Sequence, residues 1–213
     1  MKKKLIFTFF AILILNIFPL ILKPELIYNY KSVVLIAVAC ILWLSQPAFS
    51  KAEMNVDKNN DKFSILFILL SSSVSVLISI FEWAYFTQNK NQINFVSILG
   101  LIMLITGTVV RVWSIYVLGR NFTATVKVTE KHELISKGPY RIIRHPSYFG
   151  ALVAICGCPV FLNNFFSIII SVVLMMSVYI YRIKFEEKAL QEYFGNAYLE
   201  YKKKTYKLLP FIW

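Results

Sequence analysis

The sequence predicts an all-α integral membrane protein, and its composition, apolar runs and charge placement indicate that class. Of the 213 residues, 58% are hydrophobic and 16% are charged, whereas soluble domains have about 45–50% apolar residues. The formal net charge of +12 would suggest nucleic acid in a soluble protein. Here most lysines stand at the ends of apolar runs, so anionic lipid head groups explain them and no nucleic acid is expected. No linker rich in Gly, Ser or Pro divides the chain, which favours a single membrane domain.

The first four apolar runs are candidates for full spans, since a helix needs roughly 20 residues to cross a bilayer. They are Leu5–Leu22, Ser32–Phe49, Phe63–Phe86 and Phe95–Leu118. The first run follows three lysines and could pass for a signal peptide. It lacks a small-x-small cleavage site and ends in FPLILKPE, so we expect a retained first helix.

The last two apolar runs, Tyr148–Leu162 and Phe165–Tyr181, predict a short helical hairpin because only Asn163-Asn164 separates them. Pro146 favours the first turn of the earlier helix. Beyond the hairpin, apolar residues repeat at helical spacing up to Gly195, where a helix end is expected. The prediction is therefore about six apolar helices, four of them full spans, with a cytoplasmic amphipathic helix at the C-terminus.

The basic residues predict the orientation. With a cytoplasmic N-terminus, that side receives nineteen Lys and Arg residues, and the other side receives only Lys23, Lys31 and Lys90. Positive charge is retained on the cytoplasmic side. We expect a multi-pass protein of the cell (plasma) membrane with both termini in the cytoplasm.

Few ionisable or metal-ligating residues fall inside the apolar runs. Glu82 and Arg111 differ in depth by roughly 15–20 Å at 1.5 Å per residue, so no direct pair is expected. Glu82 is expected to reach the outer boundary, and Arg111 either the inner boundary or a polar cavity there. Cys40, Cys156 and Cys158 lack zinc-site spacing, so they are expected to be reduced packing residues, and no metal is implied.

Two polar segments hold nearly all the candidate chemistry, 119–150 and 182–213. Both lie on the cytoplasmic side by the charge argument, and the hairpin between them should bring them together. In the first, Pro146 keeps His145 out of helical conformation. The basic residues near it are consistent either with a solvated patch next to the membrane or with a ligand-binding site.

In the second polar segment, Arg182 and Glu186 share a helix face, whereas Glu187 lies about 100° away. Glu187 is therefore expected to contribute less to ligand binding than Glu186. An interfacial helix with ordinary surface ion pairs would explain the same pattern. The run Lys202-Lys203-Lys204 is assigned to anionic lipid head groups.

These residue types suit S-adenosylmethionine. Its ammonium group pairs with a carboxylate such as Glu186, and its carboxylate with His145 or the N–H groups after Pro146. The sulfonium favours an aromatic face, which Tyr140 or Tyr148 offers. There is no GxGxxG after a strand, so no Rossmann unit is predicted.

At these residues the chain resembles the isoprenylcysteine carboxyl methyltransferase (ICMT) family, as an integral membrane member of bacterial or archaeal type. The matching pieces, within residues 95–213, are NFTATV, HELISKGPYRIIRHPSYFGAL and RIKFEEKALQEYFGNAYLEYKKKTYKLLPF. The Arg-His-Pro-x-Tyr turn alone also occurs in some membrane sterol reductases. Its combination with Glu-Glu and FG-x-x-Tyr-x-x-Tyr in this order is specific.

The resemblance implies an S-adenosylmethionine pocket that faces the cytosol, with a lipid-side entrance for the acceptor. Carried over by motif, Arg182 faces the acceptor carboxylate and forms the catalytic pair with Glu186. The implied cofactor contacts are His132, Glu133, Leu134, Ile135, Tyr140, His145, Pro146, Ser147, Tyr148 and Glu186. Residues 91–213 would form the methyltransferase core, and residues 1–90 would be N-terminal transmembrane helices of unassigned role.

Four functions fit these observations to different degrees. The leading hypothesis is methyl transfer from S-adenosylmethionine to a lipophilic acceptor that enters from the bilayer, with carboxyl O-methylation of an isoprenylcysteine-like substrate as the family interpretation. The alternatives are a phospholipid amine N-methyltransferase, an NADPH-dependent membrane reductase and a non-enzymatic scaffold. Neither of the last two requires the block from Glu186-Glu187 to Tyr201.

Overall fold

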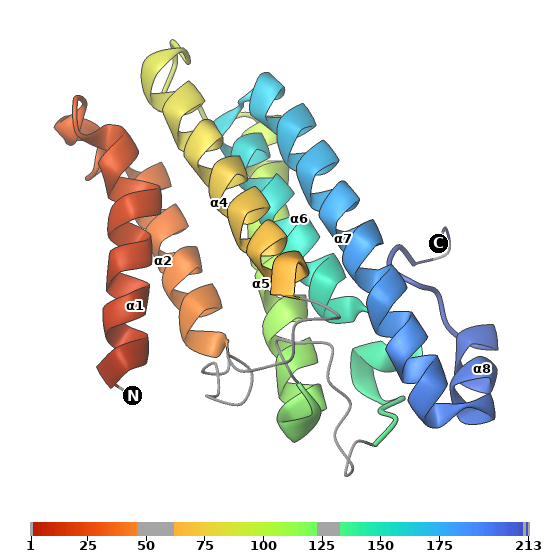
Figure 1. Ribbon diagram of the computed structural model, residues 1–213. Coiled ribbons are helices and arrows are strands. Elements are labelled where there is room, and N and C mark those ends of the chain that lie inside the picture. Colours follow the sequence, from red (N-terminus) through yellow and green to blue (C-terminus); the bar gives the residue numbers. More distant parts are fainter. Residues whose placement is uncertain (1, 47–61, 123–132, 211, 213) are drawn as a thin grey trace.

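A computed structural model describes residues 2–46, 62–122, 133–210 and 212, and every regular element in these ranges is helical (Figure 1). The helices are α1 (Lys2–Ile12), α2 (Tyr30–Ser45), α4 (Lys62–Tyr85), α5 (Phe95–Leu118), α6 (Pro146–Leu162), α7 (Phe165–Phe194) and α8 (Asn196–Lys203). A π-helical turn at Leu13–Ile17 and short 3-10 turns, among them Gly138–Arg141, complete the order.

Among the described residues, three helices are long and apolar enough to cross a membrane, at Ser64–Tyr85, Phe95–Leu118 and Phe165–Phe194. Three shorter apolar helices lie at Leu5–Leu20, Tyr30–Ser45 and Pro146–Leu162. All six predicted apolar runs are thus helical over most of their described length, with residues 47–49 of the second run outside the described residues. Four of the runs were expected to be full spans, and the first two of these form shorter helices. The first differs from the prediction because its α-helix ends at Ile12 and continues as π and 3-10 turns around Pro19, a residue whose ring disrupts α-helical hydrogen bonding.

Helix α7 also differs from the prediction, since it is one continuous helix of 30 residues. The sixth apolar run and the following polar segment were expected to be separate helices. No Gly or Pro interrupts residues 165–194, so nothing in the backbone chemistry breaks the helix before Gly195. Gly195 has φ +55° and ends it, as predicted. The apolar membrane stretch and the polar residues that follow it therefore belong to one continuous helix.

Helices α5 and α6 approach closely where two glycines interlock. A Cβ atom on Gly107 would lie 2.7 Å from the carbonyl oxygen of Gly150, and one on Gly150 would lie 2.7 Å from that of Gly107. Both distances are shorter than van der Waals contact, so neither position accepts a side chain without separating the helices. This packing fixes the start of α6 against α5.

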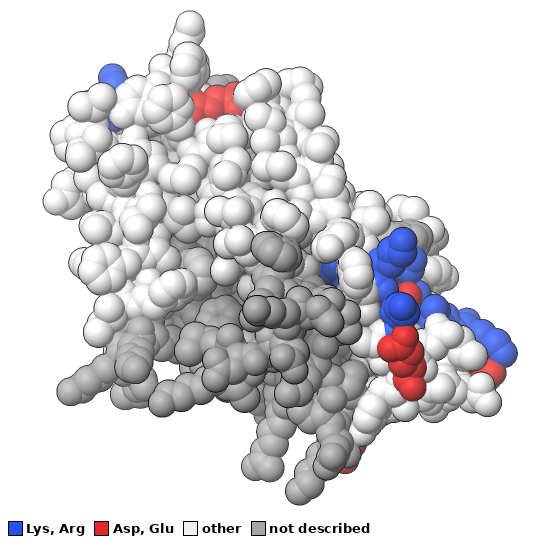
Figure 2. Space-filling model, viewed as in Figure 1, with Lys and Arg blue, Asp and Glu red and all other residues white. Residues whose placement is uncertain are grey.

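The helices run up and down, so the N-terminus, the ends of α2 and α5 and the starts of α4 and α6 gather at one end of the bundle (Figure 1). The polar half of α7 and α8 lie at that end too. On the face drawn in Figure 2, charged residues cluster over α7 and α8, whereas the surface over the spans is almost free of charge. This arrangement matches the predicted meeting of the two polar segments.

Glu82 lies at the opposite end of the bundle, at the end of α4. Its Oε2 atom accepts hydrogen bonds from the backbone N–H of Ser167, at 2.8 Å, and from the hydroxyl of Ser167. Ser167 is in the first turn of α7, so the carboxylate meets unpaired N–H groups at the positive end of that helix. Glu82 is therefore a structural cap, and it does not pair with Arg111.

Candidate active site

The loop before α6 is held by the end of the chain. The backbone N–H groups of Arg144 and His145 donate to the carbonyls of Tyr206 and Lys207, at 2.8 and 3.1 Å. The N–H of Tyr206 donates back to the carbonyl of Ile142 at 3.0 Å. Residues more than sixty positions apart thus form a short parallel bridge, which confirms that the two polar segments meet.

A largely buried cluster of polar and charged side chains reinforces this bridge, and we call Arg144, His145, Glu187 and Lys202 the Glu187 cluster. Glu187 Oε1 accepts from Arg144 Nε at 2.7 Å and lies 3.4 Å from His145 Nε2. Its Oε2 lies 3.6 Å from Lys202 Nζ. Arg144 also donates to the carbonyl of Thr205. Glu187 is only 8% exposed, so it joins the loop, α7 and α8 from inside.

A stack of three rings passes through the same region. His145 lies on Tyr148 with ring centres 5.6 Å apart, and Tyr148 lies on Tyr179 at 5.0 Å. The Tyr148 hydroxyl donates to Glu186 Oε2 at 2.6 Å and accepts from Arg182 Nε at 3.2 Å. Tyr148 therefore joins the ring stack to the two charged residues that sequence analysis placed on one helix face.

Arg182 is buried, at 2% exposure. Its Nη1 donates to the hydroxyl of Ser64 on α4 at 2.6 Å, and its Nε lies 3.9 Å from Glu186 Oε2. The Glu186 side chain is 28% exposed. A surface ion pair does not describe this arrangement, because the guanidinium is enclosed between α4, α6 and α7 while the carboxylate stays accessible.

Arg111 contacts the first turn of α6 from α5. Its Nη1 donates to the carbonyl of Ser147 at 3.1 Å and to the Ser147 hydroxyl. Its Nη2 donates to Gln46 Oε1 at 2.9 Å, and its guanidinium lies 5.7 Å from the centre of the Phe122 ring. Of the two predicted environments, the structure thus places Arg111 among polar partners, and one of them is Gln46, the residue that follows α2.

Tyr140 fixes the 3-10 turn ahead of the loop. Its hydroxyl lies 3.4 Å from the carbonyl of Ser114 on α5, and its own carbonyl accepts from the Tyr201 hydroxyl at 2.6 Å. Burial raises the pKa of both phenols above the ordinary value of 10.0. Both hydroxyls are therefore protonated near neutral pH and act as donors that hold the fold.

The structure brings some of the predicted site residues together and separates others. His145, Tyr148, Arg182 and Glu186 form one contiguous group. Pro146 and Ser147 are buried in the first turn of α6 beside it. Glu133, Leu134 and Ile135 lie in the extended segment before the Gly138 turn, with Glu133 exposed and the other two half-buried. His132 lies outside the described residues.

Several residues of this region were not identified from the sequence as site residues. Glu187 and Arg144 hold the loop, Ser64 contacts Arg182, and Tyr179 extends the ring stack. Ser64 and Arg182 are 118 positions apart, so no local pattern could join them. The adjacent Glu186-Glu187 pair was the available indication that two carboxylates enter the site from different helix faces.

The arrangement suits binding of a ligand that carries both charges. The half-buried carboxylate of Glu186 attracts a cation, and the buried guanidinium of Arg182 binds an anion. The faces of the stacked rings favour a positively charged group. Within the described ranges no three His, Cys, Asp or Glu side chains lie close enough to hold a metal ion.

Comparisons with known proteins show which family this chain resembles. The isoprenylcysteine carboxyl methyltransferase (ICMT) family model matches residues 99–192. The probable protein-S-isoprenylcysteine O-methyltransferase of Oryza sativa subsp. indica is 36% identical over 146 residues, covering 68% of this chain and 76% of that protein. Protein-S-isoprenylcysteine O-methyltransferase B of Arabidopsis thaliana is 35% identical over 154 residues, covering 70% and 78%. The solved structure of the eukaryotic intramembrane Ras methyltransferase ICMT matches with a TM-score of 0.66 and 25% identity, covering 97% of this chain and 74% of that one.

The apolar helices, the charged site at one end of the bundle and these likenesses define an integral membrane methyltransferase. The chain belongs to the isoprenylcysteine carboxyl methyltransferase family. The resemblance found in the sequence is thus confirmed, and the reductase and scaffold alternatives are excluded.

Proposed function

We propose that the protein transfers a methyl group from S-adenosylmethionine to the carboxylate of an isoprenylcysteine-like acceptor, at the cytoplasmic face of the cell membrane. The observation that carries the proposal is the placement of Arg182 and Glu186. They are opposite charges one turn apart on α7, and both contact the Tyr148 hydroxyl. They lie where the apolar part of α7 gives way to its polar part.

The side chains around Tyr148 fit S-adenosylmethionine. Glu186, with its accessible carboxylate, would hold the ammonium, and the stacked rings of Tyr148 and His145 would lie beside the sulfonium. His145 Nε2 faces Glu187, which leaves Nδ1 for the cofactor carboxylate. When bound, S-adenosylmethionine supplies an electrophilic methyl group on a sulfonium that leaves as a neutral thioether.

Arg182 would orient the acceptor. A carboxylate is ionised near pH 7, so it needs no general base before it attacks. A guanidinium fork binds both carboxylate oxygens and presents them in a fixed direction, and such positioning is a large part of the barrier reduction in a two-substrate reaction. The hydrogen bond from Arg182 to Ser64 holds the guanidinium between α4 and α7. A prenyl tail could then remain in lipid along the apolar surfaces of these two helices.

The membrane orientation belongs to the same proposal. Both termini and the Tyr148 region lie in the cytoplasm, and residues 91–213 form the methyltransferase core, which contains the family match at 99–192. Anionic head groups contact the basic residues at this face. The role of residues 1–90 includes support of Ser147 through Gln46 and Arg111.

A binding titration followed by a methyl-transfer assay tests the proposal. Full-length protein in neutral detergent should bind S-adenosylmethionine and S-adenosylhomocysteine but not NADPH. Labelled methyl should then pass to an S-prenylated cysteine with a free carboxylate, and not to its carboxamide. Transfer to phosphatidylethanolamine instead would show phospholipid amine N-methylation, and binding of NADPH alone would refute the proposal.

A further inference from the structure

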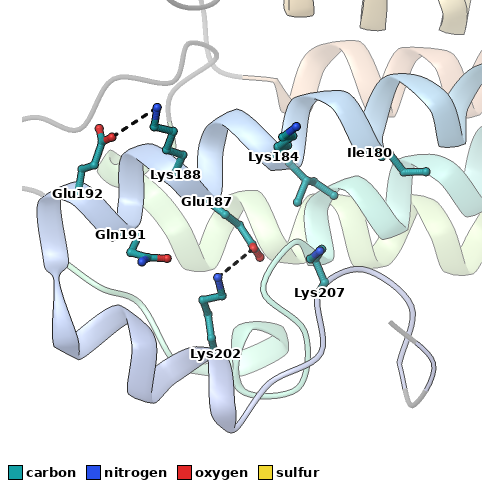
Figure 3. A pocket seen from close by; sticks show the side chains of 9 residues that line it. Ile180, Lys184, Glu187, Lys188, Gln191, Glu192, Lys202 and Lys207 are labelled. Atoms are coloured by element: carbon teal, nitrogen blue, oxygen red, sulfur yellow. Dashed lines mark ion pairs between the residues drawn. The ribbon is translucent and has the colours of Figure 1, made fainter.

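A groove of about 710 Å³ lies between α7, α8 and the chain that follows α8 (Figure 3). It is separate from the Tyr148 region, since neither Arg182 nor Glu186 lines it. Four lysines surround it, Lys184 and Lys188 from α7, Lys202 from α8 and Lys207 beyond. The space is within the range of small-ligand sites, about 300–1,000 Å³.

The charge of the groove favours an anion. Its two glutamates are both engaged, Glu187 with Lys202 at 3.6 Å and Glu192 with Lys188 at 3.9 Å (Figure 3). Glu187 is also paired with Arg144 from inside the protein, at 2.7 Å. Four lysines against two glutamates leave the lining with a net positive charge.

The groove continues into an apolar surface of α7. Four exposed apolar residues lie on the same helix face as the groove, since i+3, i+4 and i+7 spacings superpose on a helix. They are Phe166, Ile169, Val173 and Ile180, each between 48% and 64% exposed. Lys184 and Lys188 follow at the next turns of that face. One stripe of α7 thus passes from exposed hydrocarbon to lysine.

We propose that this groove binds the head group of an anionic phospholipid, with the phosphate among the lysines and the acyl chains along the apolar stripe. A membrane-spanning helix meets phosphate groups where its apolar stretch ends, and here that point is the step from Ile180 to Lys184. Nearby lysines attract anionic lipid. A free anion would use the lysines but would not contact the apolar stripe that continues from the groove.

The site is more specific than general attraction to a charged membrane. Lys203 and Lys204 are lysines of the same basic segment, but they do not line the groove. Lys202 links the groove to the Glu187 cluster, which holds the loop bearing His145. An occupant that contacts Lys202 would therefore be connected to that loop through the Lys202–Glu187 ion pair. The proposal does not depend on methyl transfer.

Native mass spectrometry of the full-length protein, released from neutral detergent with added phosphatidylglycerol, tests this inference. The wild type should retain one phosphatidylglycerol at least tenfold more tightly than phosphatidylcholine. The double variant Lys184→Gln/Lys188→Gln should weaken that binding about tenfold to thirtyfold. The control Lys203→Gln/Lys204→Gln removes the same charge and should change it less than threefold. Each pair contains one lysine in an ion pair with a glutamate of its own helix.

Three results would overturn the inference. These are equal losses in both double variants, equal retention of phosphatidylcholine, and displacement of phosphatidylglycerol by inorganic phosphate at similar concentration, which would make the occupant a free anion. If the double variant does not fold, as judged by size-exclusion chromatography, Lys184→Gln alone carries the test. It should weaken binding about fivefold, and no change there would also overturn the proposal.

Discussion

Glu186 and Glu187 are neighbours in the chain but have different partners. Successive helical positions point about 100° apart, so Glu186 reaches Tyr148 while Glu187 reaches Arg144 and His145. Glu186 keeps an accessible side chain, whereas Glu187 is enclosed. The first is therefore suited to a ligand, and the second to holding the loop.

We expect Glu186→Gln to weaken S-adenosylmethionine binding about tenfold to a hundredfold, because a hydrogen bond to a charged group contributes roughly 1.5–3 kcal/mol. Thermal stability should change little, since Tyr148 can still donate to the amide oxygen. Isothermal titration measures the affinity. Glu192→Gln, at a 68% exposed side chain on the same helix, is the control. Equal losses in both would exclude a specific role for Glu186.

Arg182→Lys should separate acceptor from cofactor recognition. An ammonium group cannot reproduce the planar fork of a guanidinium, so kcat/KM for the acceptor should fall about tenfold or more. Affinity for S-adenosylmethionine should stay within a few-fold. Lys184→Arg, an exchange of the same kind at an exposed position of α7, should alter neither. Loss of cofactor binding with normal turnover at saturating cofactor would place Arg182 in the cofactor pocket instead.

Among the structural elements, α7 has the largest influence on the site. Because it is unbroken from Phe165 to Phe194, its apolar stretch, Arg182, Glu186 and Glu187 keep fixed positions relative to one another. The loop at Ile142–His145 has no such support of its own. It is ordered by the chain at Tyr206–Lys207 and by Glu187, so the C-terminal segment is part of the site.

Glu187→Gln should therefore loosen the loop. Breaking a buried ion pair costs roughly 3–5 kcal/mol, and we expect the lower end, about 3 kcal/mol, because the Lys202 side of the cluster is partly exposed. Hydrogen exchange measured by mass spectrometry should accelerate at residues 142–146 and 204–208. Glu200→Gln, at a 61% exposed side chain, should leave exchange unchanged. Unchanged exchange in Glu187→Gln would show that the backbone bridge alone holds the loop.

Over the whole molecule, the charges form a layer at one end of the bundle. Many apolar side chains of the helices are exposed along their length, and Lys and Arg gather over the polar half of α7 and over α8 (Figures 1 and 2). This asymmetry predicts the orientation in the membrane. It also places the candidate active site and the α7–α8 groove at the same face.

Reporter insertions test the orientation. Reporters after Met54 and after Arg144 should be active in the cytoplasm, and one after Lys90 outside, because nineteen of the loop basic residues favour that arrangement. The Lys90 insertion serves as the internal control for reporter activity. An external signal at Arg144 would contradict the proposed cytoplasmic site.

The amino-acid sequence was sufficient for the properties that depend on local chemistry. Apolar runs predicted the helices, Pro146 and Gly195 predicted where two of them begin and end, and spacing placed Arg182 and Glu186 on one face. The motifs from His132 to Tyr148 and from Arg182 onward identified the family. These features follow from residue type and short-range periodicity, which a chain displays before it folds.

The partners of those residues were decided only by tertiary packing. The sequence did not show that Ser64 would contact Arg182, that Glu187 would join Arg144 to Lys202, or that Glu82 would cap α7. Each contact joins residues from different elements, and most are separated by forty or more positions. Such pairs depend on how helices cross and rotate against each other, as at the Gly107–Gly150 approach. Helix packing sums many weak contacts over both surfaces, so no short stretch of sequence contains it.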